Sequence, residues 1–303
     1  MNGIYRNIKS LLERGGMESG EAKAVALLLL EKVCGLSVTE ALMDNGLEEK
    51  NYEQVMEKAR RVAKGEPVQY VLKTAEFCGM EMKVEPGVLI PRKETEELVK
   101  WVLEELRVRS QESGGRILDV GTGSGCIAVA LAKNLKDAKV EAWDVSETAL
   151  RIARENVERN GVKVKIRRMD VLEKGLQQSC CVQERGEEEE KRKGEEKERE
   201  GLDVVISNPP YVCEEEEVEM EENVVGYEPR VALFVPDEDP LVFYRAIGWL
   251  GMKVLKKEGL LFFEINRRFG KEMVELLQGM GYVEVEVRKD MFGNDRMVKA
   301  IKR

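Results

Sequence analysis

Residues 116–132 read RILDVGTGSGCIAVALA, a pattern that predicts a strand, a glycine-rich turn and a helix. The apolar run at its start is typical of a short buried strand. The apolar run at its end is typical of a buried helix. At such a turn, residues without side chains let a ligand approach the backbone, and the helix N-terminus offers unpaired N–H groups. The stretch therefore indicates an α/β fold that binds a nucleoside or dinucleotide cofactor.

Two further predicted strands each end in an acidic residue. Residues 139–144 read KVEAWD and end in Asp144, where a carboxylate can accept hydrogen bonds from both ribose hydroxyls of a nucleoside. Residues 164–170 read VKIRRMD and end in Asp170, which can accept from an adenine amino group. Nicotinamide and flavin cofactors also bind at glycine-rich turns. The turn and these two acids therefore do not identify the cofactor by themselves.

The tetrapeptide NPPY at residues 208–211 follows the apolar run 204–206. Two adjacent prolines remove two backbone donors, so a strand that ends here presents carbonyl groups and the Asn208 amide. The Asn208 side-chain oxygen and the Pro209 carbonyl can accept both N–H groups of a planar NH2 group, on which Tyr211 can stack. The alternative is a simple strand-terminating turn. Together with the two strand-end acids, the tetrapeptide favours S-adenosylmethionine over a dinucleotide and predicts methyl transfer to a planar nitrogen.

The sequence resembles the glutamine-N5 methyltransferases that modify peptide chain release factors, the HemK-like family. The resemblance covers nearly the whole chain. Besides the motifs above, it is carried by GEPVQY (65–70), EFCG (76–79), LIPRKETE (89–96), YEPR (227–230), RKD (288–290) and DR (295–296). The PRKETE element distinguishes this family from nucleic-acid adenine methyltransferases with the same tetrapeptide. It also argues against the related enzymes that methylate a ribosomal protein glutamine.

The resemblance implies an α/β fold of class I S-adenosylmethionine-dependent methyltransferases, with a Rossmann-like seven-stranded sheet and a small N-terminal helical domain. It implies methylation of the Gly-Gly-Gln glutamine in class 1 release factors, with S-adenosylhomocysteine as the cofactor product. The catalytic residues would be Asn208 and Pro209. The substrate would contact Asn208, Pro209, Pro210 and Tyr211. The implied cofactor contacts are Gly121, Thr122, Gly123, Ser124, Gly125, Asp144, Asp170, Val171 and Asn208.

Three departures from the family pattern concern the cofactor wall and nearby loops. Val171 stands where the family usually has an aromatic residue, residues 234–240 replace a glycine-rich loop, and Asn266 replaces a glycine. We expect none of them to touch the acceptor pocket.

The resemblance divides the chain into three parts. Residues 1–66 would form a helical bundle that recognises the release factor, with a purely stabilising appendage as the alternative. Residues 67–90 would form a β-hairpin linker, and residues 91–303 the catalytic domain.

The residue pattern predicts individual elements within these parts. Helices are expected over 21–33, with Ser19 as N-cap, over 52–64 and from Thr95 to Leu106. A hairpin is expected within 68–84, and late strands over 259–264 and 283–287.

Two stretches are strongly charged. Residues 177–200 form an insertion rich in Glu, Lys and Arg, which cannot bury enough apolar surface to offset its ordering entropy. We expect a solvated loop or frayed helix without a catalytic role there, with a partner-binding segment as the alternative. Glutamates also cluster over 214–222, beside the NPPY tetrapeptide. A solvated helix face explains this cluster, and steering of a basic substrate loop is the alternative.

Composition narrows the function further. The chain has 49 basic and 58 acidic residues, a formal net charge of −9, and no basic tract long enough for a nucleic-acid backbone. It has no histidine, which removes the commonest zinc ligand, and its six cysteines show no metal or disulfide spacing. We expect a monomeric cytoplasmic enzyme without a metal, a membrane segment or direct nucleic-acid binding. The alternatives are an adenine-N6 DNA or RNA methyltransferase and a non-catalytic nucleoside-binding module.

Overall fold

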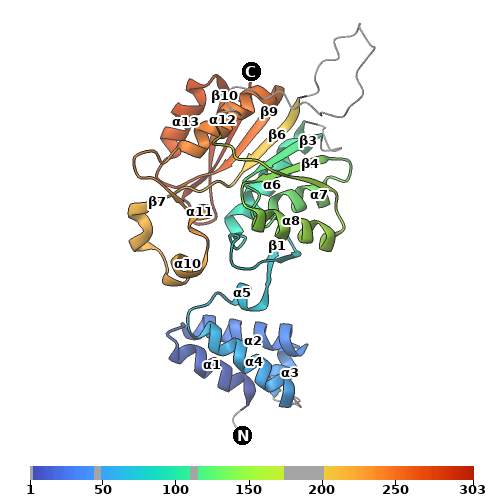
Figure 1. Cartoon of the computed structure of the whole chain (residues 1–303), viewed down its shortest axis with the longest axis vertical. Helices are drawn as coiled ribbons and strands as arrows, with labels where there is room; N and C mark the ends of the chain where they lie inside the picture. Colours follow the sequence, from blue (N-terminus) through green and yellow to red (C-terminus); the bar gives the residue numbers. More distant parts are fainter. Residues whose placement is uncertain (1–2, 44–48, 110–114, 174–200) are drawn as a thin grey trace.

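The computed structural model describes residues 3–43, 49–109, 115–173 and 201–303. They form an N-terminal group of helices, a short β-hairpin and a larger α/β body, arranged one after another along the long axis of the molecule (Figure 1). The charged insertion 177–200 lies outside the described residues.

The N-terminal helices pack around an apolar core of their own. The N-cap of the second helix is Glu18, whose carboxylate accepts hydrogen bonds from the backbone N–H groups of Gly20 (2.9 Å) and Glu21 (3.3 Å). The predicted cap at Ser19 is therefore wrong: a carboxylate one residue earlier takes this role and also complements the helix dipole. The helices are α1 (Ile4–Arg14), α2 (Ser19–Cys34), α3 (Val38–Met43) and α4 (Glu49–Val62).

A hairpin of β1 (Thr74–Phe77) and β2 (Met80–Lys83) follows the bundle. Its turn residues, Cys78 and Gly79, both have positive φ (49° and 72°), as a two-residue hairpin turn with the sheet's twist requires. The predicted hairpin is present, but its expected first part forms the short helix α5 (Val68–Leu72) instead. An ion pair between Lys32 Nζ and Glu81 Oε2 (2.8 Å) links the bundle to this hairpin.

The α/β body contains a seven-stranded sheet in the order β10-β11-β9-β6-β3-β4-β5, which confirms the predicted sheet. Neighbouring strands from β9 to β5 pair in parallel, whereas β11 is antiparallel to both of its neighbours. The chain order reverses between β3 and β6, and open α/β sheets bind ligands beyond the carboxyl ends of strands at such a point. The strands are β3 (Arg116–Val120), β4 (Lys139–Asp144), β5 (Val164–Arg168), β6 (Leu202–Ser207), β9 (Leu255–Glu264), β10 (Tyr282–Lys289) and β11 (Asp295–Lys302).

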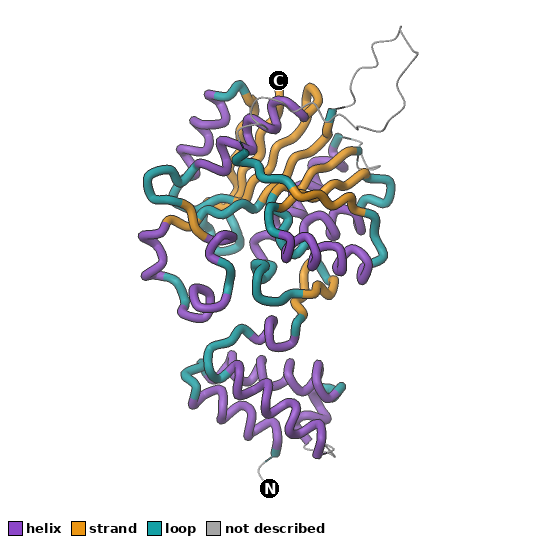
Figure 2. The backbone as a smooth tube through the Cα atoms, in the orientation of Figure 1, coloured by secondary structure: helices purple, strands orange, loops and turns teal. Residues whose placement is uncertain are grey.

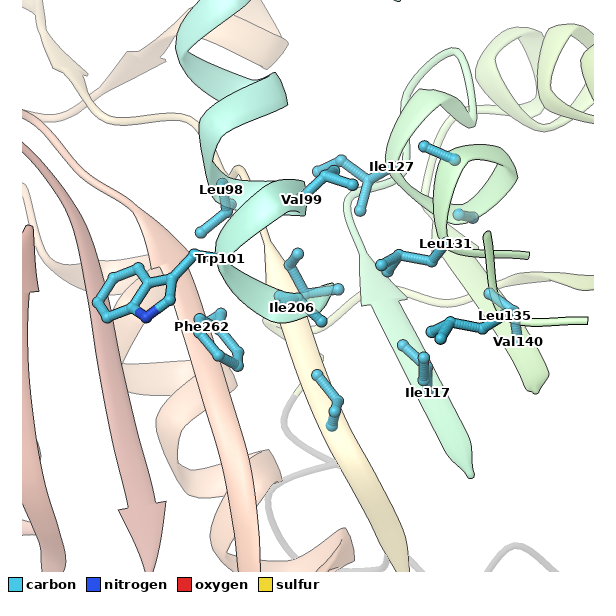
Figure 3. Close-up of a cluster of buried hydrophobic side chains, with 14 of the residues drawn as sticks. Leu98, Val99, Trp101, Ile117, Ile127, Leu131, Leu135, Val140, Ile206 and Phe262 are labelled. Atoms are coloured by element: carbon cyan, nitrogen blue, oxygen red, sulfur yellow. The ribbon is translucent and has the colours of Figure 1, made fainter. Parts of the chain in front are cut away.

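Helices cover both faces of the sheet (Figure 2). In the core on one face, Trp101 and Leu98 pack beside Phe262 and Ile206 (Figure 3). The Trp101 and Phe262 rings meet edge to face, with centroids 5.4 Å apart. This face carries α6 (Lys93–Val108), α7 (Cys126–Asn134) and α8 (Glu147–Asn160), and the other carries α12 (Val242–Val254) and α13 (Gly270–Gly279).

An excursion between β6 and α12 folds back toward the hairpin region. The buried carboxylate of Glu228 pairs with Arg92 and accepts a hydrogen bond from the backbone N–H of Ile90 (3.1 Å). The predicted acidic cluster begins with a 3-10 helix whose Glu217 pairs with Arg230. The excursion contains β7 (Val212–Cys213), η1 (Glu214–Glu219), α10 (Glu222–Tyr227), α11 (Arg230–Leu233) and β8 (Phe234–Val235).

Three observations apply only to the described ranges. None of their helices combines the length and apolar character needed to cross a bilayer. Their cysteines, Cys34, Cys78, Cys126 and Cys213, are free. They contain no cluster of three or more side chains suited to a metal ion.

Candidate active site

A cavity of about 160 Å³ lies at the carboxyl ends of β3, β4 and β6, where the strand order reverses. It brings together most of the residues that the sequence predicts for the cofactor and the acceptor. Its lining includes Gly121, Thr122, Gly123, Ser124, Asp144, Asp170, Val171, Asn208, Pro209 and Pro210. Gly125 and Tyr211 are not among the described residues that line it.

The glycine-rich turn exposes its backbone to the cavity. Gly121 and Gly123 have φ values of +71° and +55°, and a Cβ at either position would meet no atom within 4 Å. Gly125 also has a positive φ, but its Cβ would come within 3.0 Å of the Ala153 side chain on α8. Two of the glycines therefore leave room for a ligand, and the third allows close helix packing.

Asp144 is held in place at the end of β4. Its Oδ2 accepts from the backbone N–H of Gly123 (2.9 Å) and its Oδ1 from that of Ser146 (2.8 Å). Burial raises the pKa of Asp144, and these N–H groups favour its charged form. Asp170 lies nearby because the backbone N–H of Met169 donates to the Asp144 carbonyl (3.0 Å).

These groups fit an adenosine moiety. The glycine backbone is open, the two carboxylates can accept from hydroxyl and amino groups, and Val171, Phe243 and Ile247 supply an apolar wall for a flat ring. The residues of this end of the cavity are therefore those that an adenosine-containing cofactor requires.

Asn208 lies at the other end of the cavity, after β6. The strand is fixed there because the Ser207 hydroxyl donates to the Val120 carbonyl of β3 (2.6 Å). The Asn208 Nδ2 donates to the Thr95 hydroxyl oxygen (3.2 Å), and that hydroxyl donates to Glu264 Oε2 (2.6 Å). Three segments far apart in the sequence therefore hold one amide.

Tyr211 contacts Glu264 through its hydroxyl, which donates to Glu264 Oε1 (3.0 Å). Burial and the neighbouring Glu264 carboxylate raise the pKa of Tyr211 well above its usual value. The guanidinium of Arg296 lies 6.0 Å from the centre of the Tyr211 ring. The Tyr211 hydroxyl therefore supports the buried Glu264 carboxylate, and the sequence did not predict this contact.

Asn266, one of the departures from the family pattern, contacts the segment that follows Asn208. Its Nδ2 donates to the Tyr211 carbonyl (3.0 Å) and to Glu216 Oε2 (2.7 Å), and its Oδ1 accepts from the backbone N–H of Arg268 (3.0 Å). It is not among the described residues that line the cavity. Val171, by contrast, lies on the cavity wall as expected.

Comparison with known proteins identifies the family. A release factor glutamine methyltransferase from Bacteroides thetaiotaomicron is 43% identical over 286 residues, which cover 92% of each chain. Another, from Streptococcus pneumoniae, is 35% identical across 97% of this chain and 96% of the relative. This chain belongs to the release factor glutamine methyltransferase family. The motif-based assignment is thereby confirmed.

Two domain families and one solved structure also match. The PrmC N-terminal domain matches residues 4–72, and the methyltransferase small domain matches residues 81–180. A methyltransferase from Pyrococcus furiosus of known structure has 17% identity and a TM-score of 0.47, covering 84% of this chain and 99% of that chain.

Sequence reasoning missed two residues at the acceptor end of this family member's cavity. The sequence places Thr95 in the family-specific PRKETE element and at the start of a helix, and predicts no role for it in the site. Glu264 ends β9 as Asp144 ends β4, so the rule that strand-end acids face the ligand edge was the available signal.

Proposed function

We propose that this chain transfers a methyl group from S-adenosylmethionine to nitrogen N5 of the glutamine in the Gly-Gly-Gln motif of a class 1 release factor. The observation that carries the proposal is the placement of Asn208 and Pro209 in one cavity with the open glycine turn and Asp144, in a chain of this family. Methylation at this glutamine would modulate translation termination.

The cofactor would bind at the glycine end of the cavity. Gly121 to Gly125 would approach it with their backbone, Asp144 would accept from its ribose hydroxyls, and Asp170 would accept from its adenine amino group. Val171 would pack against the ring. S-adenosylmethionine supplies a methyl group on a positively charged sulfur, which activates that group toward a weak nucleophile.

The acceptor amide would bind at Asn208. Its two N–H groups would donate to Asn208 Oδ1 and to the Pro209 carbonyl, with Pro210 lining the wall beside them. These acceptors fix the orientation of the nitrogen and stabilise positive charge that develops on it. Such alignment can lower a barrier by roughly 7 kcal/mol or more. The proton can leave to water, so the mechanism requires no titrating base and suits a chain without histidine.

The remaining parts of the proposal concern the partner. Residues 1–66 would recognise the release factor, residues 67–90 would join this bundle to the catalytic domain at 91–303, and the enzyme would act as a cytoplasmic monomer. A net charge of −9 disfavours binding to a phosphate backbone, so direct nucleic-acid binding is not part of the proposal.

The test is transfer of radiolabelled methyl from S-adenosylmethionine to purified release factor. The same factor with its motif glutamine changed to glutamate, duplex DNA and ribosomal RNA serve as matched acceptors. Label is expected only on the unaltered release factor. Label on nucleic acid would favour the adenine methyltransferase alternative, and absence of label from every acceptor would favour a nucleoside-binding module.

A further inference from the structure

The acceptor asparagine is held by a buried hydrogen-bonded chain that the proposed transfer does not itself require. Thr95 on α6 and Glu264 at the end of β9 are 2% and 1% exposed. The Thr95 hydroxyl lies between Asn208 and Glu264, at 3.2 Å from Asn208 Nδ2 and 2.6 Å from Glu264 Oε2. The second oxygen of Glu264 accepts from the Tyr211 hydroxyl at 3.0 Å.

The number of protons that these side chains can donate determines the direction of each hydrogen bond between them. A hydroxyl has one proton to donate, and Thr95 gives it to the Glu264 carboxylate. Thr95 can then only accept from Asn208, so it must face the NH2 end of the Asn208 amide. Because an amide carries its oxygen and nitrogen on opposite sides of one carbon, Asn208 Oδ1 is left for the cavity that Asn208 lines.

The surroundings of Glu264 favour its role as a double acceptor. Burial raises the pKa of Glu264, whereas the hydroxyls of Thr95 and Tyr211 and the positive charge of Arg296 on β11 favour its carboxylate form. Glu94 on α6 is the like charge that opposes them. The Tyr244 hydroxyl of α12 donates to the Glu264 backbone carbonyl (3.1 Å) and leaves both carboxylate oxygens to the other two hydroxyls.

We propose that Thr95 and Glu264 are positioning residues that set which end of the Asn208 amide faces the acceptor. With Oδ1 toward the cavity, Asn208 accepts from an NH2 group and repels a carboxylate. The pair therefore selects glutamine over glutamate as well as orienting the reacting nitrogen. This inference rests on the proposed function, because it concerns the acceptor that the proposal assigns to Asn208.

The test compares Thr95→Val, which keeps the side-chain shape without the hydroxyl, with Thr95→Ser, which keeps the hydroxyl. We expect Thr95→Val to lower kcat at least about tenfold and Thr95→Ser to stay within about threefold of wild type, with cofactor affinity within about threefold in both. If loss of the donor to Glu264 prevents folding of Thr95→Val, as judged from its Tm, Thr95→Ala replaces it, because its smaller side chain leaves room for a water molecule at that oxygen. Equal kcat in the hydroxyl-free and serine variants overturns the inference.

Two readouts separate positioning from a general structural effect. In the Asn208→Ala background, removal of the Thr95 hydroxyl should lower kcat by less than about twofold, because its effect passes through Asn208. Calorimetry with release factors bearing glutamine or glutamate in the motif should show a preference for glutamine that falls at least threefold in Thr95→Val. A full additive loss in the double variant, or an unchanged preference, contradicts the inference. Absence of transfer by the wild-type protein would instead contradict the proposed function.

Discussion

Two buried carboxyl groups each accept a hydrogen bond from a residue that lines the cavity, and their hydrogen bonding differs. Glu264, which bonds the Thr95 hydroxyl beside Asn208, accepts from a hydroxyl at each of its oxygens. Asp119, at the end of β3 beneath the glycine turn, accepts at Oδ2 from the Thr122 hydroxyl (2.6 Å). Its buried Oδ1 has no partner of ordinary hydrogen-bond geometry in the described part of the chain, although the backbone N–H of Ala128 favours the charged form of this carboxyl.

This difference reflects how the two ends are built. At the cofactor end, residues close in sequence shape the site through backbone N–H groups and glycine conformations. At the other end, side chains from two distant segments hold Asn208, with Thr95 and Glu264 separated by 169 positions. We therefore expect side-chain substitutions to act on turnover at the acceptor end, and on cofactor affinity or stability at the cofactor end.

The largest effect should come from Asn208→Ala. It removes one of the two proposed acceptors for the substrate amide, and loss of one such group typically lowers kcat by about 100-fold or more. Cofactor affinity should stay within about tenfold. Single-turnover methyl transfer and calorimetry with S-adenosylmethionine measure the two quantities separately. Asn134→Ala is a matched control, because Asn134 lies on α7 and its Nδ2 donates to the Ala130 carbonyl of the same helix (2.9 Å), away from the cavity lining. Normal turnover in Asn208→Ala would contradict its proposed role.

Asp119→Asn should change how stability depends on pH. Burial raises the pKa of Asp119 to about 7, with the nearby Asp144 adding to the effect. Between about pH 4 and pH 7 the folded protein therefore keeps a proton that the unfolded chain releases. The free energy of unfolding contributed by this group falls as pH rises through that window and stays low above it. The free energy of unfolding of Asp119→Asn, relative to that of wild type, should therefore rise by roughly 2–4 kcal/mol as the pH goes from 5 to 8.

Urea unfolding of both proteins at several pH values measures this gain. Carboxyl groups far from Asp119 titrate equally in the two proteins, so the difference between them reports Asp119 together with its neighbour Asp144. A difference that does not vary with pH would show that the Asp119 carboxyl is not protonated in the folded state.

The two ends also differ in how far the sequence alone predicted them. The cofactor end could be predicted because its signals are local: the strand Lys139–Asp144 and the glycine turn follow from adjacent residues. The acceptor chain could not, because no local pattern brings Thr95 to Glu264. The errors at α2 and α5 have a related cause. Glu18 and Ser19 are both able to cap a helix, and five residues such as Val68–Leu72 are too few for periodicity to separate helix from strand.

Gly123→Ala tests whether backbone openness serves the cofactor. A Cβ at Gly123 meets no protein atom within 4 Å, so only a bound cofactor would contact it. Gly161 at the end of α8 is a matched control, since it has a similar positive φ (63° against 55°) and equally open surroundings away from the cavity. Both variants should lose about 1–2 kcal/mol of stability from the left-handed backbone. Only Gly123→Ala should weaken S-adenosylmethionine binding, by about tenfold, as calorimetry measures. Equal affinities in the two variants would contradict the assignment of the turn.

Asn266→Gly restores the residue usual in the family and should have the smallest effect on turnover. Asn266 does not contact Asn208, but its Nδ2 binds the Tyr211 carbonyl, and the Tyr211 hydroxyl supports Glu264. Loss of all three hydrogen bonds of the Asn266 side chain should cost roughly 1.5–4 kcal/mol of stability, at about 0.5–1.5 kcal/mol for each. It should lower kcat less than about fivefold, because Thr95 and Glu264 still hold the Asn208 amide. Thermal unfolding and methyl transfer measure both values. If kcat falls as far as in Asn208→Ala, orientation of the amide depends on the Tyr211 backbone and not on the buried hydroxyl chain.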